Sequence, residues 1–253
     1  MAILITAPTL TEGWLGGVQA LVAIGGEAFD LMVEIVNPNL EAGDESAFRS
    51  LDAFLIENDM HDTRTVANTI FPNDMAHSSR DRAALYSRYR ELLPRLHRLP
   101  GNGHGLYFER LISYPLQRDP LRANQLELTI SRLHDELQLP GPLKHAYELE
   151  IHAPGVDTRP MGFPCMSALS FHLDSGRLRL AATYRNQYYV QRALGNFLGL
   201  ARLQAFVAAQ VDLPVAALSV HAFHAQIDPQ VGKHDMHRLL ASMPAEAARF
   251  VPA

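Results

Sequence analysis

Cys165 is the only cysteine among the 253 residues, and it directly follows Pro164. A single thiol cannot close a disulfide within the chain, and it cannot supply a metal site built from several cysteines. Two roles remain. A free cysteine is commonly a small, buried core residue. It can also be a nucleophile, because a thiolate attacks electron-poor carbon well and leaves again. The polar residues that follow Cys165 favour the nucleophile.

Three of those polar residues have side chains suited to binding a substrate. Arg185 can hold an anionic group through two parallel hydrogen bonds. Asn196 offers both a donor and an acceptor, so it can recognise the edge of a planar ring. His224 lies in an apolar stretch. Each has an ordinary alternative role, as a surface arginine, a helix cap and a core histidine respectively.

In order and spacing, the segment from Cys165 to Ile227 resembles the thymidylate synthases and their pyrimidine hydroxymethylase relatives. The runs that carry the resemblance are Pro164-Cys165, Tyr184-Arg185-Asn186, Leu194-Gly195-Asn196-Phe197 and Phe223-His224-Ala225. Two further runs match upstream, Gly105-Leu106-Tyr107 and Asn124-Gln125-Leu126.

The resemblance implies a reaction in which the Cys165 thiolate adds to carbon 6 of a pyrimidine. Carbon 5 then takes a one-carbon unit from 5,10-methylenetetrahydrofolate and ends as a methyl or hydroxymethyl product. Arg185 is implied to stabilise the thiolate and hold a substrate anion. Asn196 is implied to recognise a uracil-like ring, since an aspartate at this position accompanies cytosine in the family. Further substrate contacts are implied for Tyr107, Asn186, His224 and Gln226.

The chain departs from the family pattern at two places: the arginines that bind the substrate phosphate and the glutamate that acts as general acid–base catalyst. The adjacent arginine pair that a partner subunit contributes is absent, and Lys144 and His145 stand in that region. The catalytic glutamate has no clean match, so Asp52 and Glu57 are the candidate carboxylates for general acid–base catalysis. The substrate therefore stays open among a nucleotide, a nucleoside, a free base and another activated ring.

Two alternatives belong to other classes of function. One is a non-catalytic descendant that keeps the fold as a ligand-binding or regulatory protein. The other is a hydrolase with a Cys165–His224 pair. A metal site is not predicted, because His221 and His224 point to opposite faces of a strand and the pair at 234 and 237 has no third ligand.

The predicted elements that must position these residues follow from periodicity and turn signals. We expect strands over 18–23, 29–36, 146–152 and 214–227, helices over 45–57, 79–96, 124–137 and 193–209, and a hairpin around Asp174-Ser175-Gly176. The mixed order predicts an α+β protein. The resemblance makes this the thymidylate synthase fold, a large mixed sheet packed by helices around a buried central helix, in one domain over 1–253.

Composition narrows the class of protein. The chain is 47% hydrophobic and 19% charged with a formal net charge of −5, which is typical of a globular protein and argues against general nucleic-acid or anionic-membrane binding. No apolar run is long enough to span a bilayer, and the first residues lack the basic region of a signal peptide. We therefore expect a cytoplasmic protein. The resemblance implies a homodimer with sheets face to face, in which Lys144 or His145 would reach the partner's site.

Overall fold

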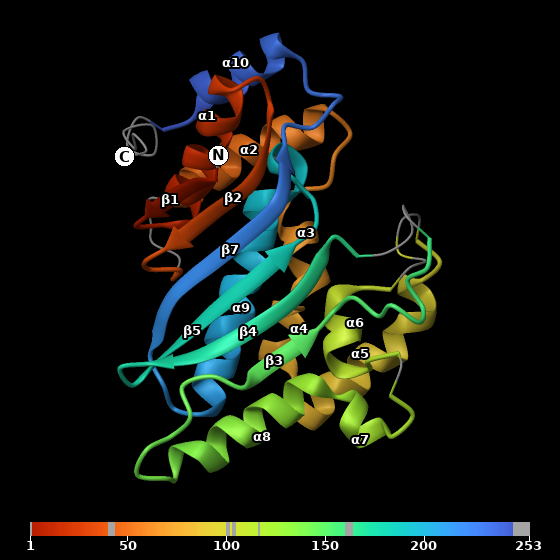
Figure 1. Ribbon diagram of the computed structural model, residues 1–253. Helices are drawn as coiled ribbons and strands as arrows, with labels where there is room; N and C mark the ends of the chain where they lie inside the picture. Colours follow the sequence, from red (N-terminus) through yellow and green to blue (C-terminus); the bar gives the residue numbers. More distant parts are fainter. Residues whose placement is uncertain are drawn as a thin grey trace.

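A mixed β-sheet forms one layer of the protein, seen in a computed structural model that describes residues 2–39, 44–99, 102, 105–115, 117–159 and 164–244. Its strands are β1 (Ile3–Ala7), β2 (Glu27–Ile35), β3 (Tyr147–Glu150), β4 (Met166–Asp174), β5 (Arg177–Tyr184), β6 (Gln187–Tyr188) and β7 (Val215–Gln226). They are ordered β1-β2-β7-β5-β4-β3, and β6 pairs with β7 (Figure 1). The pairs β1/β2, β5/β7 and β6/β7 are parallel, and the others are antiparallel.

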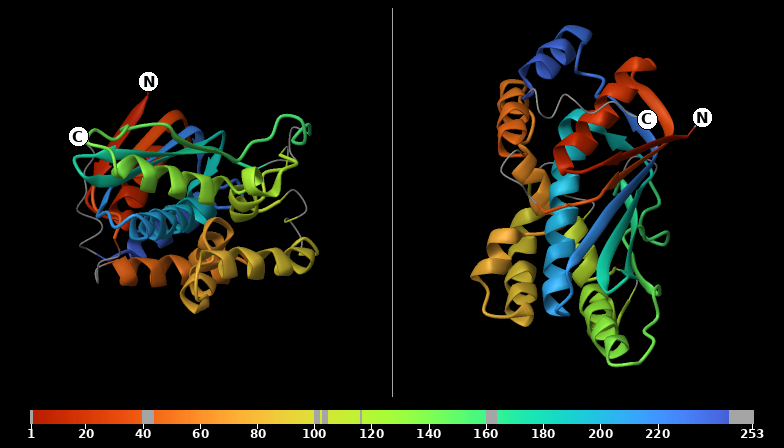
Figure 2. Two further views of the ribbon diagram at one scale, coloured as in Figure 1. Left: turned by 90° about the horizontal axis from the view of Figure 1, so that it is seen from below. Right: turned by 90° about the vertical axis from the view of Figure 1, so that its left-hand side faces the viewer.

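Helices cover one face of this sheet in two layers. They are α1 (Leu10–Ala23), α2 (Asp44–Glu57), α3 (Thr63–Ile70), α4 (Asn73–Ser78), α5 (Arg82–Leu96), α6 (Tyr107–Ile112), α7 (Pro120–Ala123), α8 (Gln125–Leu137), the π-helical turn η1 (Tyr189–Ala193), α9 (Leu194–Gln210) and α10 (Lys233–Ser242). Figure 2 shows α9 between the sheet and an outer layer that includes α2 and α5. None of the described helices is both long enough and apolar enough to cross a membrane.

The mixed sheet packed by helices confirms the predicted fold class at this level. Helices α2, α5 and α8 lie where helices were predicted, and α5 and α8 begin directly after Asp81 and Asn124, whose side chains cap them. The hairpin of β4 and β5, the strands β3 and β7 and the buried helix α9 are also confirmed.

The predicted strand over 18–23 is wrong, because these residues belong to α1. Thr9 accepts a hydrogen bond from the Glu12 N–H and caps this helix. Trp14, Val18 and Leu21 are buried on one face at helical spacing. Taken alone, the apolar residues 18–23 have a composition that also occurs in strands. The Thr9 cap and the helical spacing of buried residues from Trp14 onward instead indicate a helix. Strand β1, which pairs with β2, was not predicted.

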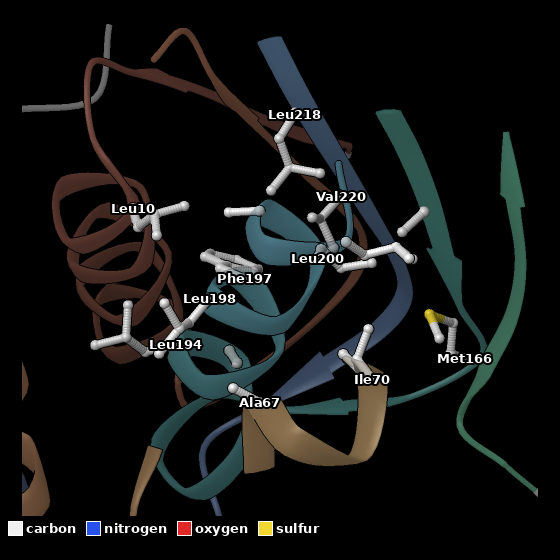
Figure 3. Packing of buried hydrophobic residues seen from close by; sticks show 14 of the residues in the cluster. Leu10, Ala67, Ile70, Met166, Leu194, Phe197, Leu198, Leu200, Leu218 and Val220 are labelled. Atoms are coloured by element: carbon white, nitrogen blue, oxygen red, sulfur yellow. The ribbon is translucent and has the colours of Figure 1, made fainter. Parts of the chain in front are cut away.

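Helix α9 occupies the centre of the core. Figure 3 shows Leu10 of α1, Ile70 of α3 and Val220 of β7 around Phe197 and its neighbours on α9. All of these side chains are buried. A helix that is apolar on nearly every side must be covered on every side, and the sheet, α1 and α3 provide that cover.

Two glycines allow α9 to approach α3 closely. A β-carbon on Gly195 would lie 2.6 Å from the Val66 β-carbon and 2.9 Å from the Thr63 carbonyl oxygen. A β-carbon on Gly199 would lie 2.8 Å from the Ala67 carbonyl oxygen. Neither backbone oxygen can move without moving α3, so small residues are required at both positions.

Replacing Gly195→Ala is expected to lower the free energy of unfolding by about 2 kcal/mol, because the added methyl group overpacks the contact between α9 and α3. Urea unfolding followed by circular dichroism measures this loss. Gly141→Ala is the matched control, since a β-carbon there meets no atom within 4 Å, and its effect should stay within about 0.5 kcal/mol. Equal stability of the two variants would contradict the close contact.

Candidate active site

A cavity of about 880 Å³ opens beside Cys165. Its wall consists of residues from α3, α4 and α5, the start of α6, the segment before β4, then β6, η1 and the first turn of α9. This volume is near the upper end of the roughly 300–1,000 Å³ typical of ligand pockets. Four residues predicted from the sequence line it: Tyr107, Cys165, Asn186 and Asn196.

Cys165 is half-buried and lies directly before β4. Its carbonyl oxygen accepts a 2.8 Å hydrogen bond from the Arg185 N–H, which closes the open end of the β4–β5 hairpin. Tyr107 is the first residue of α6. The backbone N–H groups of Met166 and Cys165 act on its hydroxyl and favour the ionised form, which lowers the pKa of Tyr107. The hairpin and α6 thus bring a thiol and a phenol to the same part of the cavity.

The Tyr107 hydroxyl stays protonated at neutral pH. Burial, reinforced by repulsion from the Cys165 thiolate, raises the pKa of Tyr107 to about 12. The two backbone donors and the Arg192 guanidinium act in the opposite direction, but they do not outweigh burial. Because it is protonated, the Tyr107 O–H can donate to a ligand or to the sulfur.

A buried ion pair fixes α6 and therefore Tyr107. Arg110 on α6 makes two 2.8 Å hydrogen bonds to the Asp157 carboxylate, and both side chains are almost fully buried. Asp157 also accepts from the Ala153 N–H. Burial alone would raise the pKa of Asp157, but these donors outweigh it and hold the pKa below that of an ordinary aspartate.

The π-helical turn η1 forms another part of the wall, and two buried side chains satisfy its backbone. The Trp14 indole N–H donates to the Tyr189 carbonyl oxygen at 2.6 Å. Asp228 accepts from the Val190 N–H at 2.8 Å. Burial raises the pKa of Asp228, although the backbone donors partly counter it. A π-helical turn often occurs at functional sites, and here it carries Gln191 and Arg192 on the cavity wall.

Two buried carboxamides on the wall lack internal partners. Asn196 is 4% exposed, and no described residue hydrogen-bonds its side chain. Gln187 is 2% exposed, and neither polar atom of its side chain has a partner among the described residues. Leaving such a group unpaired costs about 1–3 kcal/mol. A bound ligand with donors and acceptors would recover that cost.

His224 and Gln226 act on the cavity through Asn186. The Asn186 side-chain oxygen accepts from His224 Nδ1 at 2.7 Å and from Gln226 Nε2 at 3.0 Å. This leaves the Asn186 NH₂ group as the donor toward a ligand. The other His224 nitrogen lies 3.6 Å from the Glu27 carboxylate. His224 thus does not pair with Cys165, and neither His224 nor Gln226 lines the cavity.

Arg185, Lys144 and His145 also lie outside the described wall of the cavity. Arg185 Nε donates to the Pro164 carbonyl oxygen at 3.3 Å, so the side chain follows the backbone beside Cys165. Lys144 and His145 are exposed and lie just before strand β3, which begins at Tyr147. Within one protomer they do not reach the thiol.

The two predicted carboxylates have contacts elsewhere. Asp52 accepts a 2.8 Å hydrogen bond from the Thr63 N–H and so joins α2 to the start of α3. Glu57 forms an exposed ion pair with Arg238 of α10. Asp74 is the one carboxylate among the described wall residues. The same residues show no group of three histidine, cysteine or carboxylate side chains placed to hold a metal ion.

Sequence reasoning missed Gln187, Gln191 and Arg192. The predicted helix begins at residue 193, where the apolar run begins, and leaves these three polar residues outside it. The signal was present: three long polar side chains precede a helix that is otherwise apolar. The π-helical turn, which periodicity does not predict, brings Gln191 and Arg192 to the cavity, and the short strand β6 brings Gln187.

A scan against protein-family models finds no family that matches this chain, and a search of curated proteins finds no match either. The cavity itself combines a thiol, a protonated phenol, several carboxamides and a guanidinium. Such a set suits nucleophilic addition to a polar planar ring, with hydrogen bonds from the carboxamides orienting that ring.

Replacing Asp157→Asn is expected to lower the free energy of unfolding at pH 7 by about 3 kcal/mol, because it leaves the Arg110 charge buried without its partner. The native pKa of Asp157 is depressed. Its contribution is therefore complete above the unfolded pKa of about 3.9 and is lost as the pH falls through the lower native value.

Urea unfolding at pH 7 and pH 3 checks this, with the difference between wild type and Asp157→Asn shrinking at pH 3. Glu45→Gln is the control, since Glu45 pairs with Arg49 on an exposed helix face and should change stability by less than about 0.5 kcal/mol. A difference that does not depend on pH would argue against the ionised pair.

Proposed function

We propose that this protein has the thymidylate synthase fold and transfers a one-carbon unit to carbon 5 of a uracil-like ring through transient addition of Cys165. The supporting observation is that Tyr107, Cys165 and Asn196 come from distant segments to one cavity. The proposal suits a reducing compartment such as the cytosol, where a single thiol stays free.

Cys165 would act as the nucleophile. Its thiolate forms a bond to carbon 6 of the ring, and the electron pair of the carbon 5–carbon 6 double bond moves toward the carbonyl oxygen at carbon 4. The side-chain NH₂ group of Asn196 would donate to that oxygen as charge develops.

Carbon 5 is now nucleophilic, and it would bond to the one-carbon unit. Loss of the carbon 5 proton would then let the bond from that unit to its carrier nitrogen break, with the electron pair staying on the nitrogen. Addition of hydride from the reduced folate for a methyl product, or of water for a hydroxymethyl product, would expel the thiolate and restore the carbon 5–carbon 6 double bond.

Tyr107 and Asn186 would hold the ring and the sulfur in this geometry. Tyr107 remains protonated, so its O–H donates toward the sulfur that forms and breaks the carbon bond. Asn186 presents its NH₂ group because His224 and Gln226 occupy its oxygen. These two residues are positioning residues, since they act through Asn186.

5,10-Methylenetetrahydrofolate would supply the one-carbon unit. The cavity of about 880 Å³ has the volume for a second flat ring, and its wall includes the apolar residues Leu92 and Leu96 of α5 and Leu99 just after that helix. Leu99 is 53% exposed, which leaves an apolar surface at the mouth. Such a surface suits an aromatic group stacked next to the substrate.

A second candidate function is ligand binding without catalysis. It is favoured by the lack of a free carboxylate among the described wall residues: Asp74 pairs with Arg64, and Asp52 and Glu57 lie elsewhere. Proton transfer to the ring would then need Tyr107 or water. A binding protein would hold the same ring through Asn196 without forming a bond to Cys165.

The covalent step predicts a trapped adduct. Incubation with 5-fluorouracil, 5-fluorouridine or 5-fluoro-UMP together with 5,10-methylenetetrahydrofolate should add the mass of ligand and cofactor to the intact protein, because fluorine at carbon 5 blocks the elimination that releases the thiol. Mass spectrometry checks this, and peptide mapping should place the adduct at Cys165. Cys165→Ser should form none.

Three outcomes separate the candidate functions. A folate-dependent adduct with one fluorinated ligand supports transfer. Saturable binding of the same ligands by calorimetry, with no adduct and equal affinity in Cys165→Ser, supports the ligand-binding protein. Neither binding nor adduct with any of the three would contradict a uracil-like substrate.

We also propose a homodimer through the sheet face that faces away from the helices in Figure 2. Side chains alternate along a strand, and Asp30, with φ 56°, interrupts that alternation in β2, so Phe29 and Met32 are both exposed although they are three residues apart. Four apolar side chains are exposed there: Leu4, Phe29, Met32 and Phe223. Phe29 also stacks on His224, which contacts Asn186 of the cavity. A partner on this face would therefore support the site.

Replacing Phe223→Glu should weaken such a dimer by about tenfold or more, because it puts a charge in an apolar contact. Sedimentation velocity over a range of concentrations checks this. Leu128→Glu, on the outer face of α8 and 47% exposed, is the control and should leave association unchanged. A wild-type protein that sediments as a monomer at all concentrations would contradict the dimer.

A further inference from the structure

Arg192 stands out among the described wall residues of the cavity. It belongs to η1, on the side of the cavity that also carries Gln187 and Gln191. Tyr107 and Cys165 line the same cavity as Arg192. The Arg192 charge also acts on the Tyr107 hydroxyl and works to lower its pKa. The cavity that contains the thiol therefore also contains a positive charge.

No carboxylate neutralises Arg192 within the described part of the chain. It forms no ion pair and no side-chain hydrogen bond there. Asp74, the one carboxylate on the described wall, is already paired with Arg64. A guanidinium that faces a cavity without a counter-ion is suited to bind an oxyanion through two parallel hydrogen bonds.

Arg192 lies better for this role than Arg185. Arg185, the arginine that the sequence suggested, does not line the cavity, and its Nε donates to the Pro164 carbonyl oxygen. Arg192 lines the cavity and lies on a turn whose backbone Trp14 and Asp228 hold in place. A fixed turn lowers the entropic cost of positioning the guanidinium.

We infer that Arg192 binds an oxyanion of the ligand, a carboxylate or phosphate group, next to the ring that Cys165 attacks. The inference deepens the proposed function and rests on its assignment of this cavity as the ligand site. The unpaired carboxamides of Asn196 and Gln187 would contact the ring, and Arg192 its anionic substituent. The substrate class is then an anionic heterocycle and not a neutral base.

The single cysteine allows a test that needs no pyrimidine. Iodoacetate and iodoacetamide both alkylate a thiolate: a sulfur–carbon bond forms, the carbon–iodine bond breaks and iodide leaves. Only iodoacetate carries a carboxylate. The ratio of their rate constants at Cys165 therefore reports whether a cation in the cavity binds an entering oxyanion, and the iodoacetamide rate alone reports the state of the thiol.

Arg192→Gln should lower the iodoacetate rate constant about fivefold and leave the iodoacetamide rate constant within about twofold, because a charge in a cavity with low-dielectric walls concentrates anions there. Arg192→Lys should retain part of the preference. Arg177→Gln, an exposed arginine at the turn of the hairpin, is the matched control and should leave the ratio unchanged.

Adding sodium phosphate or sodium acetate at equal ionic strength distinguishes the two oxyanions. Stronger protection of wild type by phosphate indicates a phosphate site, and stronger protection by acetate indicates a carboxylate site; Arg192→Gln should lose either. An unchanged ratio in Arg192→Gln would overturn the inference, as would an equal or larger loss in Arg185→Gln. Because no pyrimidine is used, this result can hold or fail separately from the adduct at Cys165.

Discussion

The hydrogen bonds that satisfy the π-helical turn η1 are the interaction on which the cavity depends. A π-helical turn disturbs the regular backbone pattern of a helix, and buried backbone groups without partners are costly. Here Trp14 supplies a donor from α1, and Asp228 supplies an acceptor from the segment after β7. Because both partners come from other elements, the turn forms only when the sheet, α1 and α9 are assembled. The polar side chains of η1 are then already in place when a ligand arrives.

The parts of the cavity wall on α3 and α6 are held by different means. Glycines at 195 and 199 bring α3 against α9 without a layer of side chains between them, and the pair of Arg110 and Asp157 ties α6 to the segment after β3. One wall thus depends on close packing and a buried charge pair, the other on backbone hydrogen bonds. Such a site is rigid before binding, which reduces the entropy that a ligand must overcome.

Secondary structure was predicted correctly where a clear hydrophobic period was bounded by a turn or a helix cap. The β4–β5 hairpin alternates around a Ser-Gly turn, and α8 begins after an asparagine cap, so both were predicted correctly. The stretch at 18–23 was mistaken for a strand because its composition is shared by buried helices, and tertiary packing of Trp14 and Val18 decides the outcome. For the site, spacing from Cys165 led to Asn196, and the upstream run Gly105-Leu106-Tyr107 led to Tyr107 through the family resemblance. It could not lead to Arg192, because no local rule predicts a π-helical turn whose partners are distant in sequence.

The solitary thiol has a consequence for oxidative stress. Cys165 opens on a cavity, and the chain contains no second cysteine to resolve a sulfenic acid as an internal disulfide. Oxidation there would persist until a small thiol from the cell, such as glutathione, reduced it. A peroxide that entered the cavity would therefore oxidise Cys165 reversibly at the first step and irreversibly at the next. With Cys165 as the nucleophile of the proposed function, the redox balance of the surroundings would then set the fraction of protein able to react.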